Sequence, residues 1–211
     1  MSSVSVSSAG FTRVGIVGGG IMGTGIAEVC ARAELEVILI EVDEATADAA
    51  RVTMRHSLDR AVQRDKLDAT AADEAARRLT CLHDITALAD REIVIEAVVE
   101  ARDAKLAIFE QLRDVVENRD AILASNTSSI PIVEIATATG DRADHVLGLH
   151  FFNPVPVLSL VEIVPSLLTS NEVTERAHAF AADQLGKDPI VAPTVPDLPS
   201  MPCSSLMSSR R

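Results

Sequence analysis

Three glycines near the amino-terminus have the spacing of a dinucleotide-binding turn. Gly18, Gly20 and Gly23 form the pattern GxGxxG between the apolar run Arg13–Val17 and a helix-like segment. In such a turn the first glycine permits a sharp bend, the second lets a pyrophosphate approach the main chain, and the third lets helix and strand pack closely. The free N–H groups of the helix N-terminus attract the phosphates. We therefore expect cofactor contacts at Gly18, Gly20, Ile21, Met22 and Gly23.

An acidic residue closes the second predicted strand. Glu41 follows the run Glu36–Ile40 and lies 18 residues after Gly23. A carboxylate at this place accepts hydrogen bonds from the adenosine ribose hydroxyls and repels a 2′-phosphate. Because no arginine follows Glu41 closely, the sequence favours NAD over NADP as the cofactor. The alternative is a glycine-rich turn followed by a solvent-exposed glutamate.

Two further segments carry side chains suited to proton transfer. The segment Ser125–Ser129 (SNTSS) follows an apolar run, where a serine can also act only as a helix N-cap. His150 ends another apolar run, and Glu162 lies 12 residues further on. An imidazole with an ordinary pKa of about 6.5 suits a general base. Spacing alone leaves open whether His150 and Glu162 form a pair.

Patterns of strands and helices alternate along the chain. They predict an α/β protein whose mainly parallel sheet is covered by helices on both faces, with a helical hairpin inserted after the second strand. The expected strands are Arg13–Val17, Glu36–Ile40, Glu92–Glu96, Ala121–Ala124, His145–His150 and Leu158–Val164. The expected helices are Ile21–Ala33, Glu44–Gln63, Ala69–Arg78, Ala104–Glu117, Ile130–Ala136 and Glu172–Leu185.

The composition excludes several other classes of protein. The 211 residues carry a formal net charge of −12, which argues against coating nucleic acid or an anionic membrane. With no Trp, no Tyr and five Phe, a base-stacking platform is not expected. No apolar run approaches the ~20 residues of a membrane helix. The three cysteines form no CxxC pair, so we expect no metal site and a reduced, cytoplasmic compartment.

Four segments together resemble one known family. In chain order they are GGGIMGTGIA, IEAVVEARDAK, SNTSSIPI and GLHFFNPVPVLSLVEIV. They are similar to the L-3-hydroxyacyl-CoA dehydrogenases, above all to the bacterial 3-hydroxybutyryl-CoA dehydrogenases. The resemblance implies a Rossmann-type domain that binds NAD. It also implies oxidation of a short-chain (S)-3-hydroxyacyl-CoA to the 3-oxoacyl-CoA, a step of fatty acid β-oxidation.

The resemblance implies roles for single residues. His150 matches the base that takes the proton from the 3-hydroxyl of the substrate, and Glu162 matches the carboxylate that orients the imidazole. Ser128 matches a serine that hydrogen-bonds to the substrate oxygen. Further cofactor contacts are expected at Glu100, Lys105 and Asn153. Contacts with CoA are expected at Ser57, Arg64 and Lys66, although a solvated helix face explains the two cations equally well.

The chain departs from the family in two places. The family's first helix usually ends in Gly, whereas Ala33-Glu34 stands here, and we expect a modest cost in stability. We also expect a disordered tail at 1–12, an NAD-binding domain at 13–192 and an irregular tail at 193–211. The last segment is rich in Pro and Ser and matches nothing in the family, which continues with a helical domain that forms the homodimer. A frameshift near Pro193 explains the break, and a natural truncation or a divergent tail is the alternative.

Three functions therefore stay open. The first is the dehydrogenase activity, with little turnover expected if the cleft-closing domain is missing, because catalysis needs a closed and ordered site. The second is an NAD-binding module without catalysis. The third is an enzyme that uses the same fold on another substrate, such as a sugar acid.

Overall fold

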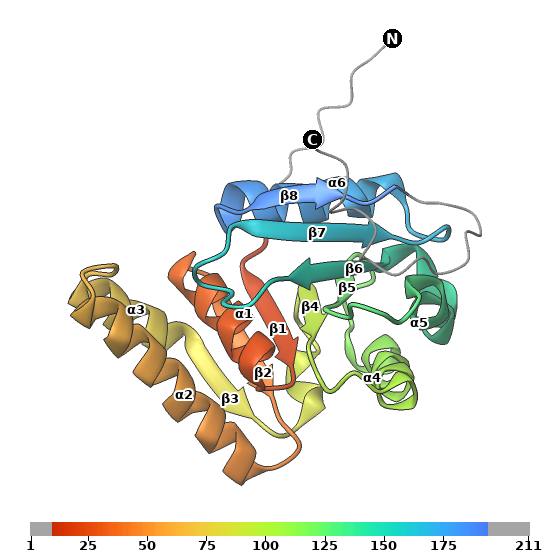
Figure 1. Ribbon diagram of the computed structural model, residues 1–211. Coiled ribbons are helices and arrows are strands. Elements are labelled where there is room, and N and C mark those ends of the chain that lie inside the picture. The colour runs from red at the N-terminus through yellow and green to blue at the C-terminus, as the bar shows by residue number, and fades with distance from the viewer. Residues whose placement is uncertain (1–9, 194–211) are drawn as a thin grey trace, which may run out of the picture.

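Eight strands form one sheet in the computed structural model, which describes residues 10–193. The strands are β1 (Arg13–Val17), β2 (Glu36–Ile40), β3 (Leu79–Leu82), β4 (Ile93–Glu96), β5 (Ile122–Ser125), β6 (Val146–Phe151), β7 (Leu160–Pro165) and β8 (Asp188–Val191). Their order in the sheet is β3-β2-β1-β4-β5-β6-β7-β8 (Figure 1). The strands from β3 to β6 are parallel, β7 is antiparallel to β6, and β8 is parallel to β7. The predicted mainly parallel α/β sheet is confirmed.

Helices cover both faces of the sheet. They are α1 (Ile21–Arg32), α2 (Glu44–Gln63), α3 (Ala69–Arg78), α4 (Arg102–Val115), α5 (Ile132–Ala138) and α6 (Asn171–Ala179). One hydrophobic core joins the sheet to α1, α2, α3 and α6, and a second joins the opposite face to α4 and α5. The helices α2 and α3 lie side by side between β2 and β3 in sequence, as the predicted hairpin insertion (Figure 1).

Burial on both faces explains the continuous apolar runs of the central strands. Val14 and Ile16 of β1 and Ile93, Val94 and Ile95 of β4 are all fully buried. A parallel strand with helices on both sides has no solvent face, so its sequence does not alternate between apolar and polar residues. These central strands form the rigid base from which the loops at their carboxyl ends project.

Two strands were missed in the sequence analysis. Both β3 and β8 have only four residues and lie at the edges of the sheet. The sequence of β8, DPIV, contains Pro189, which an edge strand tolerates because one side of its ladder is unpaired. The predicted helix Glu172–Leu185 is α6 followed by a π-helical turn, Phe180–Gln184.

The amino-terminal segment differs from the expected tail. Phe11 is buried, and its ring packs edge-on against Phe180 with ring centroids 5.4 Å apart. The N–H of Thr12 donates to Glu92 at 2.6 Å. The ordered part therefore begins before residue 13, while residues 1–9 and 194–211 of the two expected tails lie outside the described residues.

The end of α1 has an unusual main-chain conformation. Glu34 has a φ angle of +67°, in the left-handed region that favours glycine. The N–H of Leu35 donates to the carbonyl of Cys30 at 3.2 Å and closes the helix. The left-handed conformation of Glu34 thus explains the loss of stability that is expected where Ala33-Glu34 replaces the family's glycine.

Candidate active site

The glycine turn between β1 and α1 has the geometry of a phosphate cradle. Gly18 has a φ angle of +99°, and its N–H donates to the carbonyl of Ile40 at 2.8 Å. A Cβ atom at Gly23 would lie 1.7 Å from the carbonyl oxygen of Gly18, so no side chain fits there. Gly20 precedes α1, and a Cβ atom there would meet nothing within 4 Å. The turn therefore leaves the N-terminus of α1 open to a phosphate.

Glu41 follows β2 and is held by main-chain donors. Its Oε1 accepts from the N–H of Gly19 at 2.5 Å, and its Oε2 accepts from the N–H of Val42 at 3.1 Å. Glu41 also lines a cavity of about 510 Å³ together with His83 and Gln111. The carboxylate thus lies between the glycine turn and a cavity large enough for an adenosine.

His150 and Glu162 form a pair across two antiparallel strands. In the register of β6 and β7, His150 lies opposite Glu162, which accounts for their separation of 12 residues in the sequence. The Nδ1 atom of His150 lies 2.8 Å from Oε2 of Glu162. The two side chains are 20% and 37% exposed. Because Nδ1 faces the carboxylate, Nε2 is the ring nitrogen left to exchange a proton with a ligand.

Glu100 organises the loop that carries Ser128. One oxygen of Glu100, Oε1, accepts from the N–H groups of Ser128 at 3.1 Å and Ser129 at 3.2 Å, and from the hydroxyls of Ser129 and Thr127. Partial burial raises the pKa of Glu100, but the hydroxyls of Thr127 and Ser129 and the Lys105 ammonium together lower this pKa to about 2. Glu100 is therefore an anion at neutral pH.

Lys105 is buried beneath this loop. Its side chain is 1% exposed, and Nζ lies 2.6 Å from Oε1 of Glu96 and 3.3 Å from Oε2 of Glu100. Lys105, which is expected to contact the cofactor, lies behind Glu100 and pairs with it, and the cofactor contact stays a prediction. Glu96 ends β4, is fully buried and also accepts from the hydroxyl of Ser125 at 2.6 Å. Glu96 was not predicted from the sequence, although an acid at the end of a buried strand is a usable signal.

A cavity of about 360 Å³ brings together His150 and Ser128, two of the three predicted catalytic residues. It lies beyond the carboxyl ends of β4 and β5, where open α/β sheets bind ligands, and beside the end of β6. The residues that line it include Met22, Glu100, Asn126, Ser128, His150 and Asn153. Asn126 was not predicted individually, and its Oδ1 accepts from the N–H of Phe151 at 2.8 Å, which ties the β5 loop to β6.

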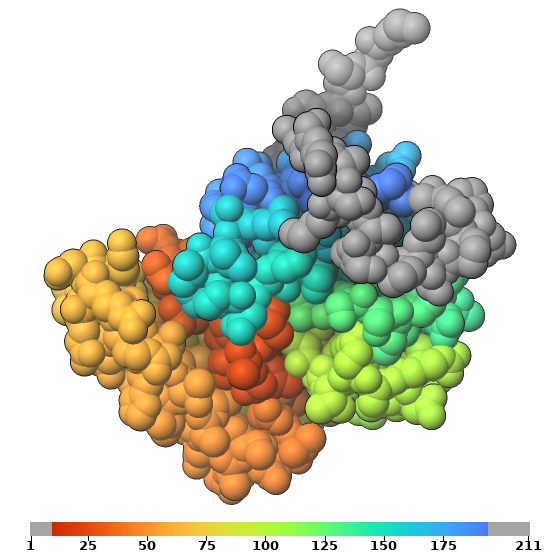
Figure 2. Space-filling model, viewed as in Figure 1, coloured from red at the N-terminus to blue at the C-terminus, as the bar shows by residue number. Residues whose placement is uncertain are grey.

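The three residues expected to contact CoA are only partly brought together. Ser57 lines a cavity of about 240 Å³ together with Arg60, between α1, α2 and the loop after β6. Figure 2 shows that loop, in cyan, lying over α1, in red. Arg64 and Lys66 are exposed at the end of α2, and Arg64 lies about 10 Å further along the helix axis than Ser57. Arg60 is thus the cation that accompanies Ser57.

Comparison with known proteins places this site in a family. Residues 13–195 match the family model of the 3-hydroxyacyl-CoA dehydrogenase NAD binding domain. The chain belongs to the 3-hydroxyacyl-CoA dehydrogenase family. Its match within that family is the NAD-binding domain, so NAD is the cofactor of this fold. The resemblance found in the four sequence segments is confirmed.

Individual members of the dehydrogenase family are similar in sequence and structure. A 3-hydroxybutyryl-CoA dehydrogenase of Mycobacterium tuberculosis is 51% identical over 175 residues, which are 83% of this chain and 61% of that protein. The crystal structure of M. tuberculosis FadB2 superposes with a TM-score of 0.85 at 49% identity, covering 87% of this chain and 64% of that one. An (S)-3-hydroxybutyryl-CoA dehydrogenase from Ralstonia eutropha gives a TM-score of 0.83 at 40% identity, covering 88% and 65%. The chain thus spans about three fifths of the length of these relatives.

Residues 10–193 contain neither a metal-binding cluster nor a membrane-spanning helix. Between residues 10 and 193, no three His, Cys, Asp or Glu side chains are grouped so that they could hold a metal ion. In the same range no helix is both long and apolar enough to cross a membrane.

Proposed function

We propose that this chain, through an NAD-binding domain at residues 13–192, binds NAD(H) and carries the catalytic base for oxidation of a short-chain (S)-3-hydroxyacyl-CoA to the 3-oxoacyl-CoA. The observation that supports this most strongly is the 2.8 Å contact of Glu162 with His150, which lines a cavity together with Ser128. A base, its orienting carboxylate and a hydroxyl donor are the groups needed to remove a proton from an alcohol.

The residues divide the reaction between them. Bound NAD⁺ supplies the acceptor for the hydride that leaves C3 of the substrate. Nε2 of His150 takes the proton of the 3-hydroxyl, and the Glu162 carboxylate stabilises the imidazolium that forms. The Ser128 hydroxyl hydrogen-bonds to the same substrate oxygen and fixes its distance from His150. The products are a 3-oxoacyl thioester, the reduced cofactor and one proton on His150.

The proposed cofactor contacts extend from the cavity beside Glu41 to the cavity that contains His150. The glycine turn and α1 would hold the pyrophosphate, with Ile21 and Met22 beside it, and Glu41 would accept from the adenosine ribose. Glu100 and Asn153 line the cavity that also contains His150, which would receive the nicotinamide end. A carboxylate at the position of Glu41 would repel a 2′-phosphate, which favours NAD over NADP.

The CoA part of the substrate is assigned to the cavity at Ser57. Ser57 and Arg60 offer a hydroxyl and a cation there, and Asn153 lines both this cavity and the one that holds His150. An acyl thioester bound at Ser57 therefore has a short path to the catalytic base. Arg64 and Lys66 add positive charge at the exposed end of α2 for the CoA phosphates.

Two measurements on the purified chain test this function. NADH is titrated by fluorescence, and acetoacetyl-CoA reduction is followed at the NADH absorbance for the wild type, His150→Gln and Ser57→Ala. We expect NADH binding in all three, loss of turnover in His150→Gln, and a raised KM for acetoacetyl-CoA in Ser57→Ala. NADH binding without turnover in the wild type would favour a binding module, and turnover in His150→Gln equal to the wild type would refute the role of His150.

A further inference from the structure

A buried carboxylate lies behind the proposed nicotinamide end of the site and takes no part in the proposed reaction. Glu96 has a fully buried side chain at the carboxyl end of β4. Its Oε1 accepts from Nζ of Lys105 at 2.6 Å and from the N–H of Val98 at 2.7 Å, and its Oε2 accepts from the hydroxyl of Ser125 at 2.6 Å. Both oxygens are thus satisfied inside the protein, and the charge of Glu96 is held in place.

Lys105 links this buried carboxylate to the cavity. Its Nζ lies between Glu96 and Glu100, the latter at 3.3 Å. Glu100 is 38% exposed and lines the cavity that contains His150. The three side chains carry two negative charges and one positive charge, so the group Glu96–Lys105–Glu100, which we call the acidic triad, has a net charge of about −1.

The two redox forms of the cofactor differ by one charge at the nicotinamide ring. The oxidised ring is a cation and the reduced ring is neutral. A net negative charge that is partly shielded from solvent stabilises a nearby cation more than a neutral ring. We propose that the acidic triad raises the affinity for NAD⁺ relative to NADH, and that Glu96 is a specificity-determining residue which acts from behind the site. This inference rests on the proposed binding of NAD(H).

Glu96→Gln is the variant that separates charge from shape. Gln keeps an oxygen for Lys105 and Val98, and its amide can donate to the Ser125 hydroxyl, which then acts as an acceptor. The triad becomes neutral while the residues that line the cavity are unchanged. For a unit charge acting over about 10 Å at an effective dielectric constant of about 40, we expect the affinity for NAD⁺ relative to NADH to fall about fourfold.

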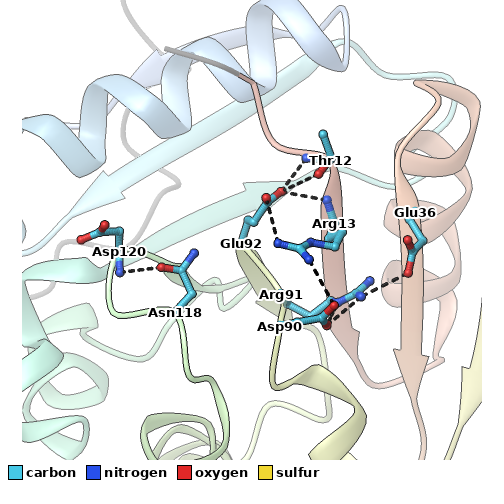
Figure 3. A network of polar contacts seen from close by, with 8 residues as sticks. All are labelled: Thr12, Arg13, Glu36, Asp90, Arg91, Glu92, Asn118 and Asp120. Carbon is cyan, nitrogen blue, oxygen red and sulfur yellow. Dashed lines mark hydrogen bonds and ion pairs between the residues drawn. The ribbon is translucent and has the colours of Figure 1, made fainter. Parts of the chain in front are cut away.

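The same strand offers a matched control. Glu92 directly precedes β4, at the opposite end of the strand from Glu96, where it accepts from the N–H groups of Thr12 and Arg13 in the polar network of Figure 3. Glu92→Gln removes the same charge from the chain but far from the cavity. We expect it to leave the ratio of the two affinities within about 1.5-fold of the wild type, since Glu92 lies about 13 Å further along the strand than Glu96. That added distance alone exceeds one Debye length of about 8–10 Å, so its charge is screened from the cavity.

The experiment measures dissociation constants for NAD⁺ and NADH by calorimetry for the wild type, Glu96→Gln, Glu92→Gln and Glu100→Gln. Glu100→Gln removes the other negative charge of the acidic triad, so its ratio of affinities should fall as well, and it tests the effect of the triad's charge if Glu96→Gln does not fold by circular dichroism. Equal loss of affinity for both forms in Glu96→Gln would overturn the inference and leave the proposed function intact. A wild-type chain that binds neither form would refute the proposed function as well.

Discussion

Replacing Glu34 by glycine is expected to stabilise the protein. Glu34 follows α1 with a φ angle of +67°, and its side chain is exposed. A residue with a Cβ atom loses about 1–2 kcal/mol in the left-handed conformation. Glycine removes this strain but adds about 0.5–1 kcal/mol of main-chain entropy to the unfolded state. The difference between these two effects should raise the free energy of unfolding of Glu34→Gly by about 0.5–1 kcal/mol.

Thermal unfolding followed by circular dichroism measures this gain. For a chain of this length about 1 kcal/mol shifts Tm by about 2–4 °C, so Glu34→Gly should raise Tm by about 1–4 °C. Glu34→Ala is the matched control, because it removes the carboxylate and keeps the strained main chain. We expect the Tm of Glu34→Ala to change by less than about 1 °C. An equal rise in Tm for both variants would assign the effect to the side chain and refute the main-chain explanation.

Two further predictions follow from the site. Gly23→Ala should weaken NADH binding at least about tenfold in a fluorescence titration. The Cβ atom of the alanine would lie 1.7 Å from the carbonyl oxygen of Gly18 and would displace the phosphate-binding turn. An unchanged affinity for NADH in a folded variant would contradict this prediction. The pKa of Glu100 in the folded state is about 2, below the ordinary value of 4.5 for a glutamate. Its ionisation therefore stabilises the fold above pH 4.5, and this contribution is lost as the pH falls towards 2. Because Glu100 is partly exposed to solvent, we expect its ionisation to add only about 1 kcal/mol to the free energy of unfolding. In urea unfolding, the wild type should therefore lose stability more steeply between pH 5 and pH 2 than Glu100→Gln does. Equal slopes for the two proteins would show that Glu100 has no such role.

Much of the fold was predictable because local patterns and packing agree. The apolar runs that became β1, β2 and β4 are buried on both faces, so their sequences carry an unbroken signal. The short edge strands β3 and β8 carry no such signal, because only one residue of β3 and none of β8 is buried, and the pairing partner supplies their stability. The burial of Phe11 could not be predicted from the sequence either, because it depends on contacts with Phe180 and Gln184, which are distant in the sequence.

The candidate site divides in the same way between local and distant determinants. By itself the sequence determined the phosphate turn and the acid after β2, because steric limits at Gly18 and Gly23 act between residues close together in the chain. Only the tertiary structure decided that His150 and Glu162 touch, since their contact depends on the antiparallel register of β6 and β7. It also decided that Lys105 is buried, because hydrogen-bond partners on β4 and in the loop after it surround its charge. Electrostatic and hydrogen-bond partners come from the packing of distant segments, and no local pattern of residues specifies that packing.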